Sequence, residues 1–71
     1  MTKSSEVLRL AAIQRDMGNH FPINELTKDD DHAYVSACEY AERAGYFQAH
    51  GKAADVEALN HAAAIAESEG D

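Results

Sequence analysis

The chain has 71 residues, a formal charge of −7 and a single cysteine, Cys38. A chain of this length forms at most one domain, so we expect one small domain over residues 1–71. One cysteine excludes an internal disulfide and fits a reducing compartment. The N-terminus lacks the apolar run of a signal peptide, and no segment has the roughly 18 apolar residues of a membrane span. We therefore expect a cytoplasmic protein with no membrane partner.

The acidic charge is unevenly distributed along the chain. Residues 1–20 carry three basic and two acidic side chains, whereas residues 21–71 carry three basic and eleven acidic ones. A surface of this sign repels nucleic acid and anionic membranes. The balance therefore disfavours direct nucleic-acid binding.

The first predicted helix covers about residues 5–17. Its apolar residues recur at three- and four-residue steps and predict one apolar face, made of Val7, Leu10, Ile13 and Met17. Gly18 and Asn19 tolerate the left-handed conformation that ends a helix. We interpret residues 20–28 as a connection, because Pro22 disfavours helix at the preceding residue and cannot donate its own amide.

The second predicted helix covers about residues 30–49. Thr27 together with Asp30, or one residue of 29–31 alone, can cap its start. Its apolar stripe is predicted to be Tyr34, Ala37, Cys38 and Ala41. Two ends are compatible with the pattern: Gly45 stops the helix, or the helix continues to residue 49 and stops at Gly51. We favour the longer helix, although an interior glycine costs roughly 1 kcal/mol.

The third predicted helix covers about residues 52–68. Its apolar stripe is predicted to be Val56, Leu59, either Ala62 or Ala63, and either Ile65 or Ala66. Acidic residues follow at its C-terminal end, where the helix dipole disfavours negative charge. We expect that end to be poorly held.

No segment shows the two-residue alternation of a strand, so the fold class is all-α. We expect three helices: an antiparallel hairpin of the second and third, with the N-terminal helix packed against it. Because large apolar residues are few, we also expect a homodimer that shares part of the core. The residues predicted for this oligomer interface are Val7, Leu10, Ile13 and Met17.

The residues that could carry chemistry lack the spacing that chemistry needs. The four histidines, at positions 20, 32, 50 and 61, form no pair at the short spacings of a zinc site. In a calcium loop starting at Asp29, Tyr34 and Tyr40 would stand where glycine and glutamate are required. Cys38 falls on the predicted buried stripe. We therefore predict no catalytic residue, no metal, no cofactor and no enzymatic activity.

Aromatic residues lie near the predicted hairpin bend, where Tyr46 and Phe47 follow a glycine. Aromatic side chains are enriched in binding hot spots, although these two could instead fill the hairpin core. The residues predicted to bind a partner protein are Tyr40, Tyr46, Phe47, Glu39 and Glu42.

Residues 34–66 resemble the ANR family of small helical regulators from enterobacteria and phages. The resemblance lies in the run Ala41-Glu42-Arg43-Ala44-Gly45-Tyr46 with Ala49, and in an alanine-rich helix with Ala58, Leu59, Ala62 and Ala63. Leu59 stands nearest to the tryptophan expected of the family. The resemblance implies a regulator that binds a nucleoid-associated or transcription-regulating protein.

These observations favour a small accessory regulator that acts by protein–protein binding. We expect a phage-borne protein that modulates a host regulatory or nucleic-acid-binding protein. The alternative is a self-assembling oligomerisation module without an external partner.

Overall fold

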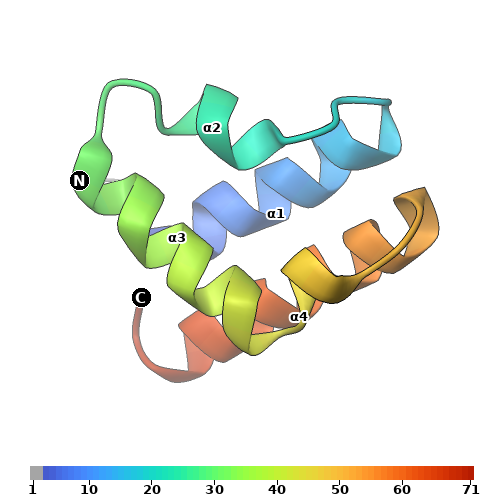
Figure 1. The fold of residues 1–71 in the computed structure, drawn as a ribbon. Coiled ribbons are helices and arrows are strands. Elements are labelled where there is room, and N and C mark those ends of the chain that lie inside the picture. The colour runs from blue at the N-terminus through green and yellow to red at the C-terminus, as the bar shows by residue number, and fades with distance from the viewer. Residues whose placement is uncertain (1–2) are drawn as a thin grey trace.

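The computed structural model describes residues 3–71, so the first two residues of the predicted domain lie outside it. Its elements are α1 (Ser4–Asp16), α2 (Pro22–Leu26), α3 (Asp31–Arg43), the 3-10 turn η1 (Tyr46–Gln48) and α4 (Lys52–Ser68) (Figure 1). No strand occurs in residues 3–71, which confirms the predicted all-α class. This part of the chain has four α-helices, where the sequence predicted three.

The additional helix, α2, lies in the segment predicted to be a connection. Pro22 is its first residue, a position where the fixed proline backbone suits a helix and the missing amide is not needed. The side chain of Asn19 accepts a hydrogen bond from the Phe21 amide at 3.1 Å and shapes the entry to the helix. This short helix is stabilised by the burial of Ile23, which is fully excluded from solvent.

The second predicted helix is shorter than expected. It begins after Asp30, whose carboxylate accepts a hydrogen bond from the Ala33 amide at 3.0 Å as a helix cap. It ends at Arg43, because Gly45 adopts a left-handed conformation with φ of 82°. The chain then forms η1, so the predicted continuation of the helix to residue 49 is wrong and the alternative stop at Gly45 is correct.

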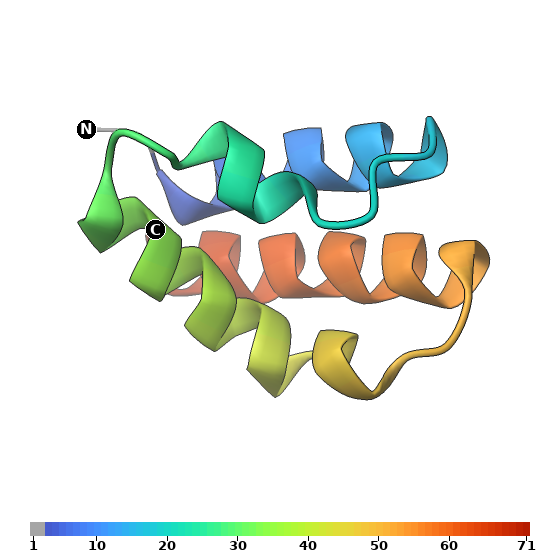
Figure 2. The same ribbon diagram turned by 45° about the horizontal axis from the view of Figure 1, so that its top comes forward.

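The most extensive contact between helices is that of α1 with α4, which lie side by side and antiparallel (Figure 2). Helix α3 crosses α4 obliquely (Figure 2). Two ion pairs span the α1–α4 contact: Arg9 with Glu67 at 3.0 Å, and Arg15 with Asp55 at 2.8 Å. The N-terminal helix is therefore the main neighbour of α4, and the predicted hairpin of the last two helices is the lesser contact.

The C-terminal end of the chain is anchored, contrary to the expectation of a poorly held end. Asp71 accepts hydrogen bonds from the hydroxyls of Ser4 at 3.2 Å and Ser36 at 3.1 Å. Its backbone oxygen accepts from the Ser5 amide at 2.9 Å. Asp71 thus supplies an acceptor to the free amides at the start of α1, which Lys3 does not cap with its side chain.

The core is built mainly from alanine. The largest fully buried apolar side chains are Leu8, Ile23 and Leu59, and alanines of α1, α3 and α4 pack around them. Alanine lets helix axes approach closely but buries little area, so three large side chains carry much of the apolar burial. None of the helices described is long and apolar enough to cross a membrane.

The face of α1 that packs inward differs from the predicted one. Its buried residues are Ser4, Ser5, Val7, Leu8, Ala11 and Ala12. Leu10, Ile13 and Met17 point to solvent instead. The prediction that Val7 shares a face with these three is wrong, because Val7 is 2% exposed within the core of its own chain.

Candidate protein-binding surfaces

One exposed apolar surface runs along α3 and η1. It is a shallow hollow lined by Tyr34, Val35, Cys38, Glu39, Glu42 and Phe47, and we call it the α3–η1 face. Val35 and Phe47 are about half exposed, at 53% and 52%. The face arises because α3 buries Ala33, Ala37 and Ala41, one residue per turn, so that larger side chains remain on the opposite side.

Phe47 is held in place from behind by two other aromatic rings. Its ring lies edge-on to that of Tyr46, with centroids 5.2 Å apart, and the Phe21 ring lies 6.4 Å away. Tyr46 is buried, and this burial raises the pKa of its hydroxyl above the ordinary value. Of the two aromatics predicted near the bend, Tyr46 therefore belongs to the core and Phe47 faces solvent.

Tyr40 lies on the other side of Glu39 and Glu42, in a separate polar hollow with Arg43 and Glu69. Its hydroxyl donates a hydrogen bond to the Glu69 carboxylate at 3.4 Å, and the Arg43 guanidinium lies 5.4 Å from its ring centroid. The hydrogen bond from Arg43 holds the pKa of Glu69 below its ordinary value. Tyr40 is thus engaged within its own chain, and the two glutamates border both hollows.

Tyr34 and Val35 belong to the α3–η1 face but were not among the predicted binding residues. The signal that could have found them is the four-residue repeat of Ala33, Ala37 and Ala41. This repeat marks the buried side of the helix and places its neighbours outside. Cys38 lies at the edge of the face, and partial burial raises the pKa of its thiol.

A second apolar surface lies on α1. Leu10, Ile13 and Met17 are 49%, 59% and 80% exposed, and we call them the outer face of α1. They line a hollow with Gln14 and Asn19, neither of which is charged. Three of the four predicted interface residues are therefore together at the surface, and only Val7 is separated from them.

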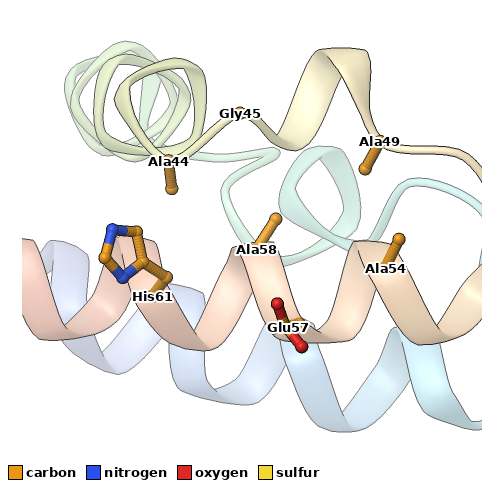
Figure 3. Close-up of a pocket in the computed structure, with 7 residues that line it drawn as sticks. All are labelled: Ala44, Gly45, Ala49, Ala54, Glu57, Ala58 and His61. Atoms are coloured by element: carbon orange, nitrogen blue, oxygen red, sulfur yellow. The ribbon is translucent and has the colours of Figure 1, made fainter.

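A fourth hollow, of about 450 Å³, lies between α4 and the end of α3 with η1. Figure 3 shows alanine side chains entering it from both sides, with His61 directed toward Ala44. Its polar side chains are Glu57 and His61, one turn apart on α4. The other lining residues are four alanines and a glycine, so the hollow offers no further polar side chain to accompany this pair.

No three side chains of histidine, cysteine, aspartate or glutamate come together in a cluster within residues 3–71. The four histidines are exposed and lie on different parts of the surface. What the described chain brings together is exposed apolar side chains, on the α3–η1 face and on the outer face of α1.

No family model, no curated protein and no solved structure matches the chain.

Proposed function

We propose that this protein is a small accessory regulator that acts by binding another protein through the α3–η1 face, and that it is not an enzyme. The observation that carries the proposal is the gathering of half-exposed Phe47 and Val35 with Tyr34 around one hollow, beside Glu39 and Glu42. Exposed apolar groups gathered in this way commonly mark interaction sites.

The α3–η1 face has the features of a binding hot spot. Phe47 is already fixed against Tyr46 and Phe21, so little side-chain entropy would be lost when a partner covers it. Its apolar centre and acidic border match a partner surface with an apolar pocket and a basic rim. Proteins that bind nucleic acid carry such basic surfaces.

The charge of −7 and the resemblance to the ANR family support the same class of target: a host regulatory or nucleic-acid-binding protein. A phage-borne regulator working in the bacterial cytoplasm fits this role. Two modes of binding are distinguishable. In the first, Phe47 anchors the complex and binding depends weakly on salt. In the second, the chain is an acidic decoy that competes with nucleic acid, and binding weakens steeply as salt rises.

A second candidate function is self-assembly without an external partner. It is favoured by the outer face of α1, where Leu10, Ile13 and Met17 are exposed together. Self-assembly predicts that this face, and not the α3–η1 face, is covered in the functional state.

Affinity capture from bacterial lysate at low and high salt, quantified by mass spectrometry, tests the proposal. Wild-type protein is compared with Phe47→Ser and with the matched control Met17→Ser, which changes an exposed apolar residue on the other face. We expect one enriched protein that is lost with Phe47→Ser and retained with Met17→Ser. Enrichment unaffected by Phe47→Ser would contradict the proposed site, and no enrichment with any bait would favour self-assembly.

A further inference from the structure

Helix α1 has two apolar faces on nearly opposite sides. Its buried side packs on α4, and Leu10, Ile13 and Met17 occupy the outer side, at steps of three and four residues. A helix that only closes the core of a monomer typically has charged or polar residues on its outer side. The second apolar face of α1 therefore calls for a second packing partner.

The distribution of charge indicates which partner can pack on the outer face of α1. Residues 1–20 carry a net charge of +1 and the rest of the chain −8, but two of the three basic side chains in residues 1–20, Arg9 and Arg15, are paired with carboxylates of α4. The hollow on the outer face is lined by uncharged residues alone. Two copies of a chain with charge −7 repel each other over most of their surfaces, and this uncharged hollow is a place where they can approach.

The charged residues beside the outer face are complementary to themselves when two α1 helices run antiparallel. Arg9 and Asp16 both lie on the α4 side of the face: Arg9 bonds to Asn60 and Glu67, and Asp16 lines a hollow with Ile13 and Val56. A two-fold axis across antiparallel helices brings the same side of each copy together. Arg9 of one copy then meets Asp16 of the other, twice, with its guanidinium, which is 45% exposed beside Glu67, shared between the two carboxylates.

We propose that this protein forms a two-fold symmetric dimer through the outer face of α1, with the two α1 helices antiparallel. In the register that pairs Arg9 with Asp16 of the second copy, Ile13 lies near the axis. Leu10 of each copy then enters the hollow between Ile13 and Met17 of the other. Asp16 is exposed and has no ion-pair partner within the described chain, so its carboxylate is free for this pairing.

The dimer also fits the composition of the core. Most of the buried apolar residues are alanines, and a domain of this size has a thin margin of stability. Covering three large apolar side chains adds burial that the chain cannot find internally. The inference does not depend on the proposed regulatory role, because the α3–η1 face shares no residue with the outer face of α1 and stays free in the dimer.

Sedimentation equilibrium over a concentration series tests the dimer. We expect reversible association from 7.7 kDa to twice that mass, with a dissociation constant typical of a small, weak interface. Ile13→Glu should raise the dissociation constant by about tenfold or more. Val35→Glu, an equally exposed change on α3, should leave it unchanged. Circular dichroism controls for folding, since both positions are exposed. A protein that stays monomeric throughout, or a dimer indifferent to Ile13→Glu, would overturn the proposal.

A charge exchange tests the antiparallel register. Arg9→Asp and Asp16→Arg should each weaken self-association, because each places like charges opposite one another in its own homodimer. An equimolar mixture of the two variants should associate as a heterodimer with both ion pairs restored. If the mixture associates no better than the separate variants, the antiparallel Arg9–Asp16 pairing is refuted even where Ile13→Glu dissociates the wild-type dimer.

Discussion

Leu59→Ala tests whether a few large side chains support an otherwise alanine-rich core. Leu59 is completely buried in the core, to which α1, α2, α3, η1 and α4 all contribute residues. The substitution removes three carbon atoms, worth about 2.4 kcal/mol at about 0.8 kcal/mol for each. The cavity left behind adds to this cost, and the total for a buried leucine replaced by alanine is about 2–5 kcal/mol. A chain of this length has a free energy of unfolding of about 4–11 kcal/mol in total.

The loss therefore takes a large part of the stability of the fold. Urea unfolding followed by circular dichroism at low protein concentration measures it, and thermal melting should show a fall in Tm of about 10 °C or more. The matched control is Val35→Ala, which removes carbon atoms from an exposed position on α3 and should change stability by less than about 0.5 kcal/mol. A cost for Leu59→Ala no larger than that of Val35→Ala would refute the reasoning.

Two further changes probe contacts between elements, and a third probes the backbone conformation at the end of α3. Asp55→Asn should cost about 1–3 kcal/mol by urea unfolding, because Arg15 loses its partner where both side chains are largely shielded, at 12% and 15% exposure; an unchanged midpoint would show that the pair adds nothing. Hydrogen bonds, chiefly the one from the Ser4 amide, lower the pKa of the Asp71 carboxyl. The ionised carboxylate therefore stabilises the fold at neutral pH, and this stabilisation is lost as the pH falls below about 4 toward the lowered pKa. Wild-type protein should then lose stability more steeply in acid than Asp71→Asn, and parallel acid profiles would contradict this. Gly45→Ala should cost about 1–2 kcal/mol from its left-handed backbone alone, since an added Cβ meets nothing within 4 Å; a neutral result in thermal melting would disprove that strain.

The sequence was sufficient for the helical class and for most helix positions, but it misled on the inward face of α1. Val7, Leu10 and Ile13 follow one another at three-residue steps, and each such step falls about 60° short of a full turn. Two steps therefore move Ile13 far around the helix from Val7. The buried face is marked instead by Leu8, Ala11 and Ala12. Small residues give a weak signal, because alanine favours helix on any face.

The two misjudged segments on either side of α3 have a common physical origin. The helix at Pro22 forms because tertiary packing buries Ile23, a gain that local propensity does not reveal. The stop at Gly45 depends on a left-handed backbone conformation, and the sequence alone left both stops open. Helix ends are decided by small energies and by contacts with distant parts of the chain.

The candidate surface was partly visible in the sequence. Phe47, Glu39 and Glu42 were predicted as binding residues, and all three lie on the α3–η1 face. Phe47 is exposed whereas its neighbour Tyr46 is buried, because η1 turns the two rings in different directions. Adjacent residues in a bend point in different directions, so their order in the chain does not tell which one faces solvent.

The most direct test of the regulator proposal is photo-crosslinking in bacterial cells from position 47, with a photoreactive phenylalanine analogue in place of Phe47. The matched control carries the analogue at Asn24, an exposed residue of α2 outside both apolar faces. The account predicts that light produces a covalent adduct with one other protein from position 47, that excess wild-type chain suppresses this adduct, and that position 24 gives none. No adduct from position 47, or an adduct containing only a second copy of this chain, would contradict binding of another protein through the α3–η1 face.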